Sequence, residues 1–331
     1  MRWGQRQNHR SFGRRTLLGG AIGLISERAL AQASSGPRRI GVLIDGAAPH
    51  PLPDALRAGL QRLGYAEGQT IAFDVRFADG QAARAAELAA ELVRNKVDLI
   101  VAHFTPAVRA AMCATTSIPI IMAPAGAPVE TGIVKSLSRP GGNVTGITNM
   151  AAELGGRRLQ LLRDMIPDLR RVAVLASSQD PFTVPFLAYM ESAAKSGGID
   201  LAPVMAAGPA DFEAAFEKIA AGKASAAVVQ GVFNSQRDAI LALASRHRMP
   251  TMWFDRRAIL AGGLVSLSAN TTDIFHRAAV MVDKVLKGAK VGDLPVEQPS
   301  VFELLVNMKA ARALGLKVPQ SVLVQADEVI E

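Results

Sequence analysis

The feature that most constrains the fold is an alternation between short apolar, β-branched runs and stretches with helical periodicity. It begins with the apolar run at residues 40–44 and continues at residues 53–63, where Leu56, Leu60 and Leu63 lie on one helical face before Gly64 ends the helix. Continuous apolar strands between helices are typical of a parallel sheet that is covered by helices on both faces. The sequence therefore predicts an α/β fold.

The alternation occurs twice along the chain. In the first half we expect further strands at 71–77, 97–102 and 118–122, with helices at 82–95 and 106–114. A turn-rich stretch at 138–146 then marks a junction. In the second half we expect strands at 172–176, 201–205, 226–229 and 251–253, with helices at 151–165, 184–195, 211–221 and 236–246. The last part, a helix at 272–287, a strand at 302–306 and a helix at 308–314, is too short for a third domain. We therefore expect two doubly wound parallel-sheet lobes that share it.

The N-terminal residues predict an exported protein. Residues 1–15 carry five arginines and no acid, residues 16–25 are apolar, and residues 31–33 read Ala-Gln-Ala, a typical signal peptidase site. We therefore assign residues 1–33 to a signal peptide and expect the mature protein to begin at Ser34 in the periplasm. The pair Arg14-Arg15 leaves both the twin-arginine and the Sec route open. An apolar run of this length is about half of the roughly twenty residues that a membrane-spanning helix needs.

Charge and cysteine content exclude two classes of protein. The chain has a net charge of +8, but the leader contributes six arginines and one glutamate, a net of +5, which leaves +3 for the mature protein. So small a charge does not support binding to nucleic acid. Cys113 is the only cysteine, so no disulfide can form within the chain.

Several segments resemble one known family, the periplasmic substrate-binding proteins of ABC transporters related to tryptophan-type binders, which have the type I periplasmic-binding fold. The resemblance covers residues 39–331. It is carried by Gly-Leu at 59–60, Leu-Gly-Tyr-Ala-Glu-Gly at 63–68, Glu-Leu-Ala-Ala-Glu-Leu-Val at 87–93, Thr-Pro-Ala at 105–107, Leu-Ser-Arg-Pro-Gly-Gly-Asn-Val-Thr-Gly at 137–146, Val-Asp-Lys-Val-Leu-Lys-Gly at 282–288, Asp-Leu-Pro-Val-Glu-Gln-Pro at 293–299 and Ala-Asp-Glu at 326–328.

The resemblance implies two lobes joined by three crossings of the chain, which we expect near Ile147, Leu264 and Pro299. The first lobe would comprise 38–147 and 265–298, and the second 148–264 and 299–331. It also implies a monomeric receptor that passes a small ligand to the membrane permease of an ABC importer. The sequence departs from the family pattern at His103-Phe104, where relatives tend to carry Gly, and at Ala127, where they tend to carry an acid.

The ligand should lie beyond the carboxyl ends of the strands, because loops and helix N-termini converge there in parallel α/β folds. Both halves of the chain and the hinge contribute residues to this region. The ligand-binding candidates are Asp45, His50, Phe104, Thr105, Pro106, Ala127, Thr148, Ser177, Ser178, Phe233, Asn234, Trp253, Phe254 and Ser266.

Thr105-Pro106 is the sharpest local signal in this set. We expect Thr105 to cap a helix whose free N–H groups face the cleft, which is a suitable site for a carboxylate. Ser177 and Ser178 would supply hydroxyl or amide donors from the opposing lobe. The alternative for Thr105 is an ordinary helix cap with no role in ligand binding. The alternative for Ser177 and Ser178 is that they are simple turn residues.

Four aromatic residues fall at or just past strand ends: Phe104, Phe233, Trp253 and Phe254. This placement predicts an apolar wall for a ligand that also has a polar end, such as an amino acid or another carboxylate with an apolar part. The alternative for each ring is a place in the local core. Asn234 and Asp45 are polar partners for an amine or hydroxyl, although Asp45 could equally cap the turn before Ala47.

Histidine placement argues against metal binding. None of the histidines has metal-ligand spacing with another His, Cys or carboxylate, so no metal and no cofactor is expected. An enzyme, a periplasmic hydrolase or transferase, would use His50 or His103 as general base near Ser177 or Asp45. However, no nucleophile elbow, P-loop or dinucleotide-binding fingerprint is present. The sequence thus favours a receptor without catalytic residues over a hydrolase, while a ligand-sensing domain for a membrane receptor shares all of these features.

Overall fold

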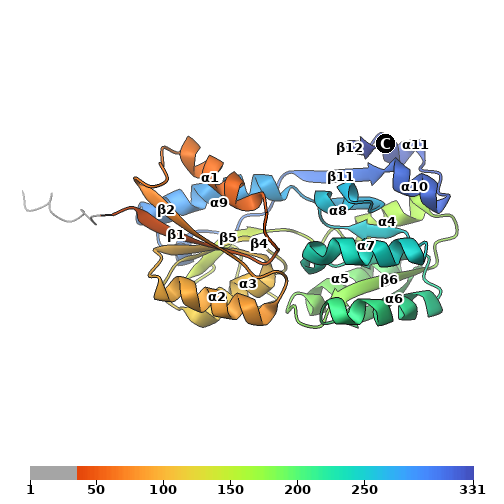
Figure 1. Cartoon of the computed structure of the whole chain (residues 1–331), viewed down its shortest axis with the longest axis horizontal. Helices are drawn as coiled ribbons and strands as arrows, with labels where there is room; N and C mark the ends of the chain where they lie inside the picture. Colours follow the sequence, from red (N-terminus) through yellow and green to blue (C-terminus); the bar gives the residue numbers. More distant parts are fainter. Residues whose placement is uncertain (1–35) are drawn as a thin grey trace, which may run out of the picture. The chain divides into compact units, whose positions relative to one another are not determined.

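The structure is a computed structural model that describes residues 36–331, which form one compact unit. The expected signal peptide, residues 1–33, lies outside the described residues. The unit contains two β-sheets, each covered by helices on both faces (Figure 1). We refer to each sheet with its helices as a lobe.

The first lobe is built on a five-stranded parallel sheet with strand order β2-β1-β3-β4-β5. Its strands are β1 (Arg38–Ile44), β2 (Ile71–Phe77), β3 (Leu99–His103), β4 (Ile120–Ala125) and β5 (Val144–Thr148). Its helices are α1 (Leu52–Arg62), α2 (Ala82–Arg94), α3 (Phe104–Ala114) and α9 (Thr271–Leu286), with a short 3₁₀ turn, η3 (Val291–Asp293), nearby. Helices α1 and α9 cover one face of the sheet, and α2 and α3 cover the other.

The second lobe is built on a seven-stranded sheet with strand order β12-β11-β10-β9-β8-β6-β7. Its strands are β6 (Arg171–Ser177), β7 (Asp200–Ala206), β8 (Ala226–Val229), β9 (Thr251–Trp253), β10 (Val265–Ala269), β11 (Phe302–Asn307) and β12 (Glu328–Ile330). Helices α4 (Gly155–Met165), α5 (Thr183–Ser196), α10 (Met308–Leu314) and α11 (Gln320–Leu323) lie on one face. Helices α6 (Phe212–Ala221), α7 (Arg237–Arg246) and α8 (Arg256–Leu260) lie on the other, with the 3₁₀ helices η1 (Pro209–Asp211) and η2 (Gly231–Gln236).

The chain crosses between the sheets after β5, after β10 and before β11. The second crossing comes later than the sequence predicted, because Val265–Ala269 pairs antiparallel with β11 and so belongs to the seven-stranded sheet. The sequence predicted that the first lobe resumes at residue 265, and this boundary is wrong, because Val265–Ala269 belongs to the second lobe. Helix α9, which follows it, packs beside α1 in the first lobe although the two are far apart in the sequence (Figure 1).

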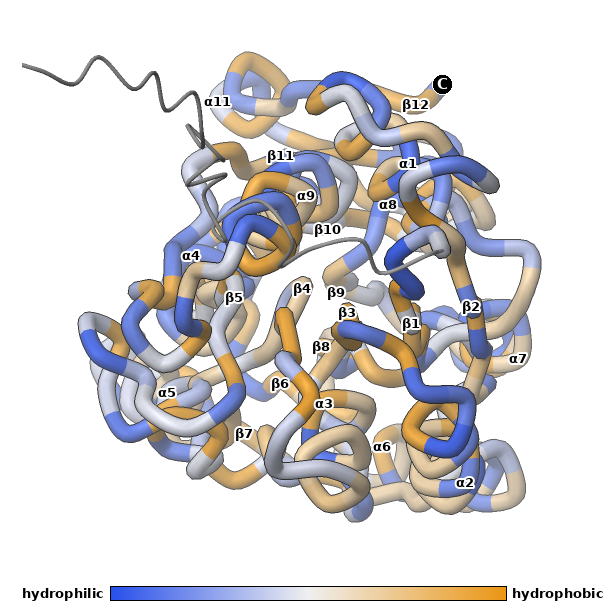
Figure 2. The backbone as a smooth tube through the Cα atoms, turned by 90° about the vertical axis from the view of Figure 1, so that its left-hand side faces the viewer, coloured by the Kyte–Doolittle hydropathy of each residue, from blue (hydrophilic) through white to orange (hydrophobic). Residues whose placement is uncertain are grey.

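Hydropathy along the helices explains how both faces of each sheet are covered. The tube of α9 alternates between hydrophobic and hydrophilic segments (Figure 2), and its buried residues include Ile274, Phe275 and Val282. Such amphipathic helices bury one side against the sheet and present the other to water. No helix within residues 36–331 is both long enough and apolar enough to span a membrane.

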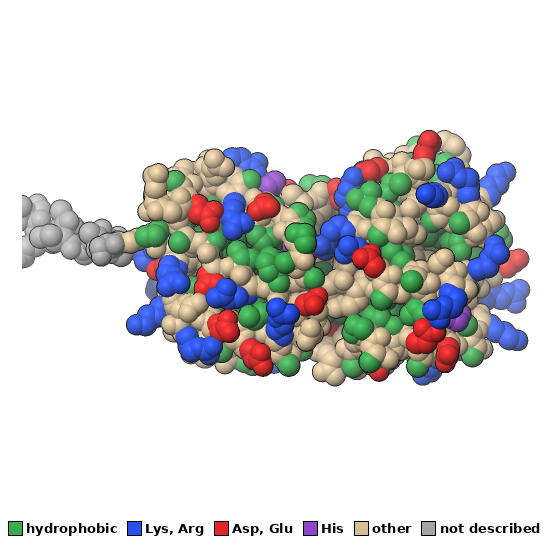
Figure 3. Space-filling model, in the orientation of Figure 1, with side chains coloured by type: hydrophobic (Ala, Val, Ile, Leu, Met, Phe, Trp, Pro, Cys, Tyr) green, Lys and Arg blue, Asp and Glu red, His purple; other side chains and the backbone are tan. Residues whose placement is uncertain are grey.

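The charged side chains are mixed on the surface. On the face shown in Figure 3, basic and acidic side chains are interspersed over both lobes. Many of them form exposed ion pairs, such as Arg57 with Asp54 and Glu67. This face therefore has no broad basic field that would attract a nucleic-acid backbone.

Candidate functional site

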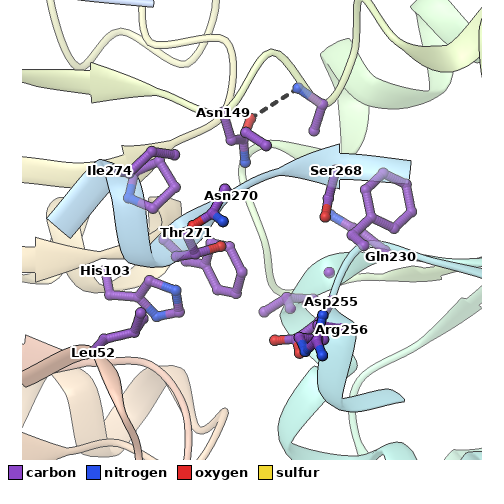
Figure 4. A pocket seen from close by; sticks show the side chains of 18 of the residues that line it. Leu52, His103, Asn149, Gln230, Asp255, Arg256, Ser268, Asn270, Thr271 and Ile274 are labelled. Atoms are coloured by element: carbon purple, nitrogen blue, oxygen red, sulfur yellow. Dashed lines mark hydrogen bonds between the residues drawn. The ribbon is translucent and has the colours of Figure 1, made fainter. Parts of the chain in front are cut away.

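A cavity of about 380 Å³ lies between the two lobes, at the carboxyl ends of the strands. Its lining includes the loop after β1 and the start of α3 from the first lobe, and the residues that follow β6, β8 and β9 from the second. Figure 4 shows His103 and Leu52 on one side of this space and Asp255 and Arg256 on the other. The volume falls within the range of small-molecule sites, about 300–1,000 Å³.

The lobes touch each other around this cavity. The Gln236 side-chain amide of the second lobe donates a hydrogen bond to the backbone oxygen of Asp79 in the first, at 3.1 Å. Gly126 of the first lobe lies so close to Phe182 of the second that an added Cβ would be 2.5 Å from its ring. These contacts bring the two lobes together beside the cavity and describe a closed arrangement of the lobes.

Aromatic rings form the apolar part of the lining. Phe104 comes from the first lobe, and Phe182, Phe186 and Phe254 come from the second. Phe186 lies between the other two rings of its lobe, with centroid distances of 5.5 Å to Phe182 and 5.7 Å to Phe254. Rings at these distances form a continuous surface on which a flat apolar group can pack.

Phe104 is held in a strained backbone conformation. Its φ is +68°, a value that bulky L-residues rarely adopt and that costs free energy. The side chain lines the cavity, and its ring centroid lies 3.9 Å from that of His103. Strain of this kind often accompanies a ligand site because the surrounding structure holds the side chain in the position that binding requires.

The structure assigns Thr105 a different role from the expected helix cap. Helix α3 begins one residue earlier, at Phe104, and has no side-chain cap. The Thr105 hydroxyl instead accepts a hydrogen bond from the backbone N–H of Gly126 at 3.2 Å, which joins the loops after β3 and β4. Thr105 still lines the cavity, so its binding to a ligand stays a prediction, while the predicted helix cap is wrong.

Polar groups of the second lobe and the hinge complete the lining. Asp180 accepts hydrogen bonds from the Phe182 N–H at 2.9 Å and from the Gln230 side chain at 3.0 Å. Burial raises the pKa of Asp180 to about 6, against the opposing effect of the Phe182 N–H. In the hinge, Asn149 accepts from the N–H of Ala151 at 3.0 Å (Figure 4).

The two cleft histidines are neutral at physiological pH. Burial, with a smaller contribution from Arg257, lowers the pKa of His50 to about 4. Burial also lowers the pKa of His103 well below its usual value. Within residues 36–331, His50 Nε2 and His103 Nδ1 have no hydrogen-bond partner, and neither ring bonds to Ser177 or Asp45. Both rings therefore offer polar atoms to a ligand, and the pairing that a general base would need is not formed.

Asp45 does not line the cavity. The side chain is almost fully buried, and its Oδ1 has no hydrogen-bond partner among the described residues. Burial, followed by the negative charge of Asp180 on the other lobe, raises the pKa of Asp45 to about 8. The closed cleft therefore favours a protonated Asp45.

We expect Asp45→Asn to stabilise the protein increasingly as the pH rises. Between the unfolded pKa of 3.8 and the folded pKa of about 8, the folded state holds a proton that the unfolded state has lost. The free energy of unfolding of the wild type therefore falls more steeply than that of the variant as the pH rises through this window. The gain should be on the order of a few kcal/mol at pH about 8 and near zero at pH about 4, measured by denaturant titration. Asp79→Asn, the same change at a partly exposed position, is the control; equal gains in both variants would contradict this account.

Most of the other predicted ligand residues do not line the cavity. The Thr148 hydroxyl accepts from the N–H of Met150, and the Ser177 hydroxyl accepts from the N–H of Gln179. Ser266 is fully buried inside β10. The remaining side chains outside the lining are Pro106, Ala127 and Ser178, as well as Phe233 and Asn234. Of the fourteen candidates, His50, Phe104, Thr105 and Phe254 line the cavity.

Two of these corrections have a clear packing reason. Phe233 packs edge-on against Phe212 at 5.2 Å, inside the core of the second lobe. Asn234 is buried and donates to Asp255 at 3.4 Å. Pro106 and Ala127 are also buried, and Ala127 accepts two hydrogen bonds from Thr131 through its backbone oxygen, while Ser178 is exposed on the surface.

Trp253 is a core residue and not part of the cleft wall. It is fully buried, its Nε1 donates to the Thr251 hydroxyl at 2.8 Å, and its ring lies against Gly263. We therefore expect acrylamide to quench the tryptophan emission of the protein from residue 34 onward only weakly, with full quenching after unfolding. Trp3 lies in the expected leader, so Trp253 would be the single reporter in that protein. Strong quenching of the folded protein would show instead that the ring is accessible from the cleft.

Sequence reasoning missed the most unusual residue of the lining, Arg158 on α4. The side chain is almost fully buried and stacks on Phe254, with its guanidinium carbon 3.9 Å from the ring centroid. A signal for it existed, because Arg158, Leu162 and Met165 follow the spacing of one helical face, and a charge on an apolar face requires an explanation. Asp180, Gln230 and Asn270 had no comparable signal.

Known proteins resemble this chain over most of its length. A tyrosine-binding protein from Clostridioides difficile (strain R20291) is 26% identical over 274 residues, which cover 81% of this chain and 79% of the relative. A solved structure of an ABC domain from Streptococcus pneumoniae in complex with L-Trp is 27% identical, with a TM-score of 0.82 over 89% of this chain and 100% of that one. A structure of a conserved domain protein from Vibrio cholerae is equally similar, with 27% identity and a TM-score of 0.82 over 88% of this chain and 99% of that one. Residues 39–330 match the family of ABC transporter substrate binding proteins, and the chain belongs to this family.

Proposed function

We propose that this protein is the periplasmic receptor of an ABC importer and that its lobes close on a small molecule with an aromatic part and a polar end. The observation that carries the proposal is the cavity between the lobes, where four phenylalanine rings meet buried polar atoms without partners of their own. The relatives support the aromatic part, since one is described as tyrosine-binding and another was solved with L-Trp.

Closure itself supplies the signal that a transporter would read. A ligand that contacts both lobes binds the closed state more tightly than the open one, so it shifts the population towards closure. The permease of the importer would then recognise the closed arrangement of the two lobes. We propose that the protein acts as a monomer, is exported by the twin-arginine or Sec route, and begins at Ser34 after cleavage of residues 1–33.

Equilibrium dialysis tests this function directly. The protein from residue 34 onward, purified without refolding, is dialysed against a mixture of metabolites, and the bound fraction is identified by mass spectrometry. The proposal predicts enrichment of a small aromatic compound that is recovered chemically unchanged after prolonged incubation. Formation of a product would instead support a periplasmic hydrolase or transferase.

Transport and sensing differ in the partner that the closed protein engages. An importer receptor loaded with its ligand should stimulate ATP hydrolysis by its permease–ATPase complex in proteoliposomes. A ligand-loaded protein that leaves ATP hydrolysis unchanged but binds the extracytoplasmic part of a membrane receptor would be a sensing domain.

A further inference from the structure

Arg158 is a buried positive charge at the edge of the cavity. It lines the space from the second lobe, and only about 1% of the residue is exposed. One face of its guanidinium covers the ring of Phe254, which also lines the cavity. Burial lowers the pKa of Arg158 to about 9, yet this value still leaves the side chain charged at neutral pH.

Among residues 36–331 no carboxylate forms an ion pair with Arg158, although the negative charge of Glu153 acts on it and partly offsets the effect of burial on its pKa. Its Nε donates to the backbone oxygen of Leu267 at 2.9 Å, and its Nη1 donates to the backbone oxygen of Ala151. Its Nη2 has no partner in that part of the chain, and no ion pair involves this residue there. A desolvated guanidinium without a counter-ion is unfavourable unless an anion completes the site.

The other charged side chains of the lining already have partners. Asp255 is held by the guanidinium of Arg257, with an Nη2–Oδ2 distance of 2.6 Å, and Arg256 pairs with Glu328. Glu303 accepts at Oε1 from the side chain of Asn270 at 2.6 Å, and its negative charge acts on Arg256, whose pKa it helps to raise.

Asp180, the remaining carboxyl of the lining, has a donor on each oxygen, and its pKa of about 6 leaves it mostly ionised at neutral pH. Each carboxyl of the lining therefore already has a donor from the protein, whereas the Nη2 of Arg158 has no acceptor among residues 36–331.

Backbone N–H groups add to this preference for an anion. Helix α9 begins at Thr271, shortly after Leu267, and both Thr271 and Thr272 line the cavity. The first N–H groups of a helix have no partner inside the helix, and the helix dipole places positive charge there. Asn270 satisfies one of them by accepting from the N–H of Asp273.

Resting on the proposed function, we propose that the ligand is an aromatic carboxylate without an ammonium group, whose carboxylate binds Arg158 and whose ring packs among the phenylalanines. Arginine suits this role because its planar fork of N–H groups matches the geometry of a carboxylate. One relative is described as tyrosine-binding and another was solved with L-Trp, and both of these amino acids are zwitterions. The ligand proposed for this chain differs from them in lacking the ammonium group.

Three probes that differ at single groups test the ligand class on the wild-type protein: desaminotyrosine, its primary amide and L-tyrosine. Isothermal titration calorimetry should show desaminotyrosine binding at least about tenfold more tightly than either of the others, since a charged hydrogen bond is lost in the amide and an unpaired ammonium is buried with L-tyrosine. Equal binding of the amide would overturn recognition of an anion. Tighter binding of L-tyrosine would overturn the lack of an ammonium site. If none of the three bound, the aromatic carboxylate class would be wrong, while the dialysis experiment would still decide the proposed function separately.

Two variants test the role of Arg158 itself. Arg158→Met should abolish the preference for desaminotyrosine over its amide. Arg157→Met removes the same charge from an exposed neighbour on the same helix and should keep the preference. Circular dichroism confirms the fold of each variant, and Arg158→Lys, which retains a charge, should keep a reduced preference. A folded Arg158→Met protein with the wild-type preference would show that Arg158 serves only to hold the hinge carbonyls.

Discussion

Gly126→Ala should weaken ligand binding at least about tenfold while the protein remains folded. A Cβ at this position would lie 2.5 Å from two ring atoms of Phe182 on the other lobe. The ring is buried and packs against Phe186, so it has little room to move away. Opening the cleft relieves the clash, because the two residues belong to different lobes. The substitution therefore shifts the population towards the open state, which binds the ligand less tightly.

Calorimetry with whichever probe the wild type binds measures this effect, and small-angle scattering in the presence of that probe reports the closure. Gly156→Ala is the matched control, because a Cβ there makes only an ordinary contact, 3.7 Å from Ala193. Wild-type affinity in Gly126→Ala would mean that closure does not bring these two residues together.

Gly146→Ala should destabilise the protein by more than about 3 kcal/mol, because the clash is with backbone that cannot move aside. Gly146 lies in β5, and its partner in β4 is Met122. An added Cβ would lie 2.1 Å from the Met122 oxygen, and the φ of +144° is one that residues other than glycine rarely adopt. The first lobe would have to separate two adjacent strands to accept the methyl group.

Denaturant titration of the folded protein measures the loss. The same control, Gly156→Ala, should be neutral or stabilising by up to about 1 kcal/mol, because alanine is favoured over glycine inside a helix. A loss of less than 1 kcal/mol on Gly146→Ala, about the size of an ordinary surface change, would contradict the close approach of β4 and β5.

The alternation of strands and helices was sufficient to predict the fold. Strand 71–77 was predicted with its observed bounds, and most other elements differ by only a few residues. Three strands were missed, β5, β10 and the three-residue β12, the first two of them for clear physical reasons. Val144–Thr148 follows glycines and polar turn residues that hide a short strand, and Val265–Ala269 alternates with serines, a pattern that carries little apolar signal.

The position of the site could also be predicted, but not the side chains that face it. Successive residues of an extended segment point in opposite directions, so Trp253 at the end of β9 and Phe254 directly after it are expected to point in different directions. The sequence does not say which of the two faces the ligand; in the structure Trp253 enters the core and Phe254 lines the cavity. The effect of Asp180 on Asp45 and the contact of Phe182 with Gly126 join residues of different lobes. They depend on how the lobes meet, so the local sequence pattern could not predict them.

Native mass spectrometry of the protein from residue 34 onward tests the central claim, that a small ligand is held in the cavity between the lobes. Wild-type protein and Gly126→Ala are expressed side by side and purified without refolding. The account predicts one non-covalent small molecule per chain in the wild type, released unchanged on denaturation, and little or none in the variant. Equal retention of the same molecule by both proteins would contradict the account, because the substitution is expected to open the cleft that holds the ligand.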